Sequence, residues 1–311
     1  GGEHLTSLKV AFGDFEFVAP DDDHPAITGT GLEMTARWNG FSVAGIVPAS
    51  HVEVVLPSAQ IHDVSAFNGL IPGDSTLSLQ SGTGEVEARL EVNDRIAAGT
   101  LDLVAEEIVL KTRETPLNGD LEVHANLAEG DLPAKKFDLA GTTIRLDDIV
   151  DEGISERKQE KLEDWFCDVE LEQGTVTFGK PMEAEGKVRL KMFDTRPVVA
   201  MLKELGTAPK GLSMMPNIKD VGGTMDVGVG KGRTALDDVV LTGEKFEVLG
   251  WLHILDKKAT GRLFINYGIL AAGIALDQGK GKVHLSKPRK WFEEQQGRPP
   301  ENADPAAVAN Q

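Results

Sequence analysis

The feature that most constrains this chain is a regular alternation of aliphatic and polar residues between Gly84 and Leu146. Two segments, 86–92 and 121–127, place Val, Ala or Leu at every second position and charged or polar residues between them. Successive side chains of a β-strand point to opposite faces, so this spacing is typical of strands with one apolar and one polar face. The sequence therefore predicts a mainly β protein.

The alternation extends over most of the chain. Residues 8–19 begin it, and Gly-rich segments between residues 223 and 285 continue it. Turns are expected at Gly and at Asn-Gly pairs such as Asn118-Gly119. The segment 57–75 contains several Pro and Gly residues and is expected to be an irregular connection.

Two segments rich in helix-forming residues interrupt the strands. Residues 155–164 combine Glu, Lys, Gln and Arg, which predicts a charged helical insertion over 151–166. Val198, Met201, Leu202 and Leu205 have helical spacing, which predicts a helix near 195–205. The expected organisation is an acidic β segment at 1–150, the insertion at 151–166, a second β segment at 167–296 that continues the same sheet, and a disordered tail at 297–311.

Negative charge is concentrated in the first half of the chain. The net charge is −18, and residues 1–150 carry 9 Lys and Arg against 25 Asp and Glu, whereas residues 151–311 carry 23 against 25. An acidic surface of this kind repels phosphate backbones, so nucleic acid is not an expected partner. Aromatic residues make up only 5% of the chain, so the apolar side of the strands is expected to be aliphatic.

The sequence contains no motif of a catalytic or metal site. Its seven histidines are scattered without H-x-H or H-E-x-x-H spacing, and there is no G-x-S-x-G element or phosphate-binding loop. Paired carboxylates such as Asp147-Asp148 are abundant, which leaves a glycan-active enzyme as a third alternative. We therefore predict a protein that is not an enzyme and that has no metal and no cofactor.

A basic and aromatic cluster follows the last predicted strand. It comprises Lys287, Arg289, Lys290, Trp291 and Phe292. Cations beside aromatic rings suit an anionic membrane surface or a lipid headgroup, so these residues are candidate membrane contacts. The alternative is an ordinary solvated face that two aromatic side chains anchor.

Repeated elements of the form Gly-x-Leu-x-Val/Leu recur over most of residues 84–285. The segments 137–146 (FDLAGTTIRL) and 261–270 (GRLFINYGIL) are examples. In these repeats the chain resembles the AsmA/TamB-type proteins of Gram-negative envelopes. The resemblance implies an elongated, curved antiparallel sheet or β-groove with a few short helices. It also implies a periplasmic location, tethering to the inner membrane in the full-length protein, and a role in phospholipid movement or outer-membrane homeostasis.

The leading hypothesis is non-catalytic binding or transfer of phospholipid or other acyl-chain lipids in the bacterial envelope. A membrane surface or an envelope protein would be a further partner. An uncovered aliphatic surface of this size usually marks a binding site. The residues expected to line the lipid groove are Val86, Leu90, Leu121, Val123, Leu139, Val188 and Leu190.

A structural or interaction scaffold is the alternative from a different class. In that case the same apolar faces would close on each other as a β core, and the acidic first half would contact a partner. Co-purifying lipid distinguishes the two hypotheses, because a closed core leaves no surface for an acyl chain.

Overall fold

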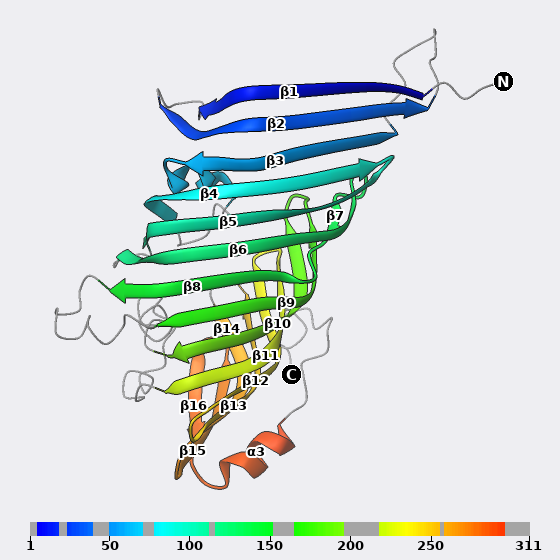
Figure 1. The fold of residues 1–311 in the computed structure, drawn as a ribbon. Helices are drawn as coiled ribbons and strands as arrows, with labels where there is room; N and C mark the ends of the chain where they lie inside the picture. The colour runs from blue at the N-terminus through cyan, green and yellow to red at the C-terminus, as the bar shows by residue number, and fades with distance from the viewer. Residues whose placement is uncertain are drawn as a thin grey trace.

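A computed structural model of the chain is one large antiparallel β-sheet of 16 strands (Figure 1). The structure describes residues 5–18, 24–39, 50–70, 78–111, 116–151, 165–195, 218–255 and 258–295. The sheet curves along its length, and in the view of Figure 1 its last strands pass behind β9–β12. The predicted mainly β fold with a curved antiparallel sheet is confirmed.

Most strands are long. The first eight are β1 (Leu5–Val18), β2 (Pro25–Asn39), β3 (His51–Ile61), β4 (Ser78–Asn93), β5 (Ile96–Lys111), β6 (Pro116–Asp131), β7 (Lys136–Asp138) and β8 (Thr142–Asp151). The other eight are β9 (Phe166–Thr177), β10 (Glu183–Asp194), β11 (Lys219–Gly230), β12 (Arg233–Gly243), β13 (Phe246–Leu255), β14 (Lys258–Tyr267), β15 (Leu270–Asp277) and β16 (Lys280–His284). The described helices are the 3₁₀ helix η1 (Val64–Leu70) and the α-helix α3 (Pro288–Glu294).

The strands follow one another across the sheet in chain order. The single departure among the described strands is that β7 and β8 share the space between β6 and β9. Because β8 pairs with β9, strands from 1–150 and from 167–296 belong to the same sheet. The expected helices at 151–166 and 195–205 and the tail at 297–311 fall, apart from a few end residues, outside the described part of the chain.

Local bulges keep the aliphatic residues on one face where their alternation changes phase. In β5 the aliphatic positions are odd-numbered up to Ala105 and resume at Ile108, and the register with β6 shifts between these two residues. The added residue, Glu107, has a φ of 51°. Asp148 in β8 and Asp238 in β12 have positive φ values at similar register shifts. A bulge adds one residue to a strand, so the aliphatic side chains beyond it stay on the same face.

Two expected connections lie inside strands instead. Pro57 is within β3, where the register with β4 shifts between Leu56 and Ala59, and a bulge tolerates a residue without an N–H. Gly119 is within β6 and pairs with Ile108 beside the bulge of β5. The prediction of a turn at Asn118-Gly119 is therefore wrong. The connection predicted over 57–75 is wrong for residues 57–61, whereas residues 62–70 lie outside the strands and residues 71–75 outside the described part of the chain. Pro57 and Gly119 therefore lie at bulges inside strands and not at strand ends.

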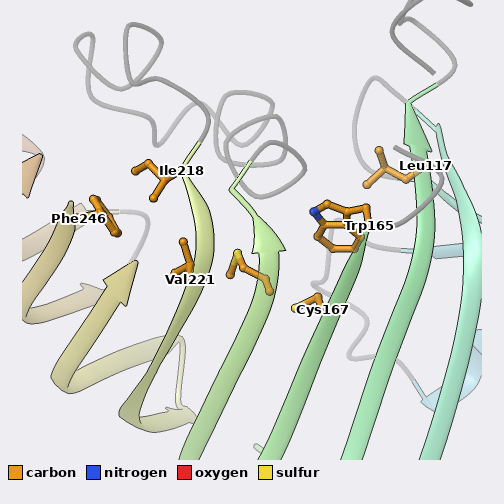
Figure 2. Close-up of a cluster of buried hydrophobic side chains, with 7 residues drawn as sticks. Leu117, Trp165, Cys167, Ile218, Val221 and Phe246 are labelled. Atoms are coloured by element: carbon orange, nitrogen blue, oxygen red, sulfur yellow. The ribbon is translucent and has the colours of Figure 1, made fainter. Parts of the chain in front are cut away.

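The hydrophobic core lies on one side of the sheet, where successive strands begin or end. We call this row of strand ends the closed edge. One cluster gathers Leu117, Trp165, Cys167, Met192, Ile218, Val221 and Phe246 (Figure 2). A second cluster gathers Ala59, Ile61, Val64, Val86, Ala105 and Ile108. The ends of the strands from β3 to β13 meet this edge, so the two clusters bury one end of the apolar face.

The helix η1 and the side chain of Trp165 cover the closed edge. Helix η1 places Val64 in the second cluster, and Asn68 fixes the helix by accepting a hydrogen bond from the Leu79 N–H and donating one to the Leu79 carbonyl. In the first cluster, the buried Trp165 donates its indole N–H to the Asp194 carbonyl at 3.0 Å. These hydrogen bonds hold bulky groups over the ends of the strands.

We predict that stability depends on the closed edge far more than on the rest of the apolar face. Ile108→Ala removes a fully buried side chain and should lower the free energy of unfolding by about 2–4 kcal/mol. Ile144→Ala removes the same group from a site that is 37% exposed, and should cost less than about 1.5 kcal/mol. Chemical denaturation of the two variants measures the difference. Equal losses would contradict the proposed location of the core.

Candidate functional site

One face of the sheet carries an unbroken row of apolar residues and glycines, which we call the central row. Each member pairs directly with the next, so their side chains lie on the same face. From β1 to β15 the row consists of Phe15, Gly29, Ala59, Val86, Leu103, Val123, Ile144, Val169, Leu190, Gly223, Leu241, Val248, Ile265 and Ala272. No polar side chain interrupts it.

Six of the seven predicted groove residues lie on this apolar face. Val86, Val123 and Leu190 belong to the central row itself. Leu121 lies one position closer to the closed edge, in a buried row that pairs Ala105, Leu121, Leu146, Cys167, Met192 and Val221. Leu90 and Val188 lie on the far side of the central row, where Leu90 pairs with Val54 and Val188 with Leu171.

The seventh residue, Leu139, lies outside the strands. It follows β7, and its N–H donates to the Gly174 carbonyl at 2.8 Å. The sequence analysis did not name other residues of the central row, such as Leu103, Ile144 and Val169. These residues belong to strands with the same alternation of aliphatic and polar residues. The alternation could have found them, but only the pairing register shows that they meet Val86 and Val123.

Burial decreases across the apolar face from the closed edge outwards. The buried row includes Ala105, Met192 and Val221, which are almost inaccessible. Leu90 and Leu101, beyond the central row, are each 38% exposed. Within the described ranges all strands belong to one sheet, and no second sheet packs on this face. The outer part of the face is therefore an aliphatic surface in contact with solvent.

The length of the central row matters for what it can bind. Neighbouring strands are about 4.8 Å apart, so the row has a contour of about 60 Å. One leaflet of a bilayer contributes about 15 Å of hydrocarbon. The row is therefore several acyl chains long.

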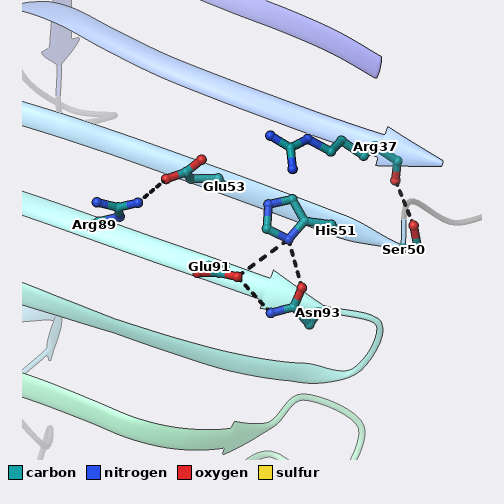
Figure 3. Close-up of polar contacts among 7 residues, drawn as sticks. All are labelled: Arg37, Ser50, His51, Glu53, Arg89, Glu91 and Asn93. Atoms are coloured by element: carbon teal, nitrogen blue, oxygen red, sulfur yellow. Dashed lines mark hydrogen bonds and ion pairs between the residues drawn. The ribbon is translucent and has the colours of Figure 1, made fainter. Parts of the chain in front are cut away.

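The opposite face is charged over β3–β10 and carries many ion pairs there, whereas over β13–β15 it carries Leu249, Trp251 and Phe264. Figure 3 shows one group, in which Arg89 contacts Glu53 at 2.6 Å and His51 lies against Asn93 and Glu91. The residues of these contacts alternate with the aliphatic positions of β3 and β4. Exposed pairs of this kind contribute little stability each, but they keep this face hydrated.

A hollow of about 470 Å³ lies on the charged face over β5–β10. Asp102 and His124 form a hydrogen bond there, with 2.5 Å between the Asp102 Oδ1 and the His124 Nδ1, and both side chains are about half exposed. Arg145 bonds Asp147 and Asp168, and its hydrogen bond with Asp147 is the main cause that raises the pKa of its guanidinium. Among the described residues no cluster of His, Cys, Asp or Glu could hold a metal ion.

The predicted membrane-contact residues lie on and beside α3, and its aromatic side chains contact the sheet. Phe292 is buried against Phe264, and Trp291 stacks on His284 with ring centroids 4.2 Å apart. Arg289 pairs with Glu247 at 3.0 Å, and Lys290 lies 3.7 Å from Glu294. Lys287 precedes the helix and is exposed. The two aromatic rings therefore fix α3 to the sheet.

These features define a single-sheet β protein with one apolar face and an opposite face that is charged over β3–β10. No described helix combines the length and the apolar character that crossing a bilayer requires. No family model, curated protein or solved structure matches the chain. The resemblance to AsmA/TamB-type proteins rests on the sequence repeats alone and stays a prediction.

Cys167 provides a chemical probe of the buried row. Burial raises the pKa of its thiol to about 11, and the Asp168 carboxylate acts in the same direction. The thiolate is the reactive form, so we predict that at pH 8 a thiol reagent modifies the folded protein roughly 100-fold more slowly than the unfolded chain. The rate should rise with pH up to about pH 11. Similar rates in buffer and in denaturant would show that the buried row is accessible.

Proposed function

We propose that this protein binds or transfers acyl-chain lipids, without catalysis, along its apolar face. The observation that carries the proposal is the central row, which crosses the sheet from β1 to β15 without a polar side chain. Solvent-exposed aliphatic side chains flank it, including Leu90 and Leu101. A continuous, solvent-exposed apolar surface of this size usually marks a ligand or partner site.

The chemistry of the face favours acyl chains over a ligand with polar groups. An acyl chain gains about 0.8 kcal/mol for each CH₂ that it buries, and it needs no directed hydrogen bond. The backbone N–H and C=O groups of the central strands are already used in the ladders, and the side chains are aliphatic. The row therefore offers the same environment along its length, which suits a ligand that slides as well as one that stays bound.

The charged face supports the same proposal. Its ion pairs, such as Arg89–Glu53 and Arg189–Glu170, lie on the side opposite to the central row. A single sheet that carried apolar residues on both faces would aggregate. With one face hydrated, the other can expose aliphatic groups for a ligand. The envelope location and the link to phospholipid movement are further parts of the proposal, and they follow only from the resemblance.

The direct test compares glutamates on the two faces of the same sheet. In the double variant Leu101→Glu, Ile144→Glu the new charges lie on the apolar face, where both side chains are partly exposed. A carboxylate against an acyl chain loses hydration, so bound lipid should fall by roughly fivefold or more. The matched control is Val104→Glu, Val240→Glu, which changes similarly exposed residues on the opposite face. Native mass spectrometry and lipid extraction give the stoichiometry.

We expect the wild-type protein and the control to carry the same amount of lipid. Equal lipid content in all three proteins would contradict binding on the apolar face. A wild-type protein that carries no lipid and acquires none from vesicles would contradict the function itself and favour the scaffold.

A further inference from the structure

The last two strands leave their end of the apolar face more exposed than any other part of the described sheet. Ile269 is fully exposed, and the exposed fractions of Leu270, Val283 and Leu285 are 70%, 59% and 73%. Val283 pairs with Ile274, which pairs with Leu263, so Val283 lies on the same face as the central row. Leu270 lies on the same face, two residues before Ala272 of the central row, whereas Ile269 precedes β15 in the turn and Leu285 directly follows β16. We call these four exposed residues, Ile269, Leu270, Val283 and Leu285, the terminal patch.

Helix α3 covers the other face of the same strands. Trp291 lies over Gly273, where a Cβ would overlap its ring, and Phe292 packs on Phe264. Gly273 pairs with Phe264 and with His284, so these residues lie on the face opposite to Val283. The chain thus places its only described α-helix behind β14–β16 and leaves the terminal patch bare.

The surroundings of the terminal patch are basic. Residues 277–294 contain five Lys and Arg against three acidic residues, Asp277, Glu293 and Glu294, in a chain with a net charge of −18. Arg289 and Lys290 are paired with glutamates, whereas Lys280, Lys282 and Lys287 form no ion pair with another described residue. Lys280 and Lys282 alternate with Val283 along β16, so they lie on the other face of this strand. Cations on one side of a strand that exposes aliphatic side chains on its other side complement an anionic bilayer, which offers phosphate groups above hydrocarbon.

The opposite end of the sheet is not basic. Strand β1 also exposes apolar side chains, among them Leu8, Phe12 and Phe17. However, β1 and β2 together have a net charge of −1, from Lys9 and Arg37 against Asp14, Glu16 and Glu33, so this end offers no excess of cations to an anionic surface. The two ends of the central row therefore differ in their affinity for an anionic membrane.

We propose that the β15–β16 end of the sheet docks on an anionic phospholipid bilayer and that acyl chains enter the apolar face there. The terminal patch inserts among the lipids, and Lys280, Lys282 and Lys287 contact their phosphates. The entry step rests on the proposed lipid binding, whereas docking does not depend on it. The rings of Trp291 and Phe292 stay on the sheet, and their role is to hold α3 in place.

Vesicle binding by the whole chain tests the docking. The probes are vesicles of phosphatidylglycerol with phosphatidylethanolamine, and vesicles of phosphatidylcholine alone. We expect binding to the anionic vesicles that weakens as salt is added, and weak binding to phosphatidylcholine. Lys282→Glu, Lys287→Glu should weaken binding about tenfold or more, because each lysine near the surface contributes to attraction. Ile269→Ser, Leu285→Ser should weaken it to a similar extent, because the inserting side chains are lost.

Matched controls come from β7 and the segments beside it. Lys135→Glu, Lys136→Glu makes the same charge change, and Lys135 shares with Lys287 a positive φ. Leu132→Ser, Phe178→Ser removes two exposed apolar side chains. Both controls should bind anionic vesicles within about twofold of the wild-type affinity. Controls that weaken binding as much as the terminal variants, or a wild-type protein that does not bind anionic vesicles, would overturn the docking proposal.

Lipid occupancy separates this proposal from the proposed function. A wild-type protein that carries lipid but does not bind vesicles overturns docking and leaves lipid binding intact. A protein that docks through the terminal patch but never carries lipid supports docking and overturns entry together with the proposed function. If both proposals hold, the terminal variants should acquire lipid from vesicles several-fold more slowly than the control variants, with unchanged lipid stoichiometry at equilibrium.

Discussion

The pairing register of the strands is the constraint on which the rest of this structure depends. Each antiparallel pair places one apolar residue opposite another, as with Val86 and Leu103 or Leu103 and Val123. A shift of one residue in any pair would move a whole strand's aliphatic side chains to the charged face. The bulges at Glu107 and Asp238 show how the chain prevents this, because each adds a residue where the alternation changes phase.

A sheet in a single layer cannot bury a complete apolar face by itself, and this chain divides the face into two parts. Along the closed edge, Trp165 and η1 cover side chains such as Ile108 and Met192, which form the core. Further out, Ile144 and Leu101 are in contact with solvent. The first part supplies stability, and the second is free to bind a ligand. The same alternation in sequence thus produces both the core and the candidate site.

Much of the fold could be predicted from the sequence, because the alternation of segments such as 86–92 and 121–127 is a local property. This alternation also predicts that six of the seven candidate groove residues lie on one face of the sheet. The ends of the strands could not be predicted in the same way: Pro57 and Gly119 have the local signature of a turn but lie at bulges inside strands. Cys167 is buried and Ile144 is exposed, although the two residues lie in neighbouring rows of the same face. This difference depends on which distant segments of the chain cover each row. Likewise, only the contacts with Phe264 and His284 show that Phe292 and Trp291 anchor a helix.

Photo-crosslinking can show on which face of the sheet the lipid lies. A photoreactive amino acid is placed at Ile144 or Leu101 on this face, or at Val104 on the charged face, in protein that is loaded with lipid. We predict lipid adducts at Ile144 and Leu101 and none at Val104, although Val104 lies next to Leu103 of the central row in the same strand. Adducts at Val104 with the same yield, or an absence of adducts at Ile144 and Leu101 in protein that carries lipid, would contradict this prediction.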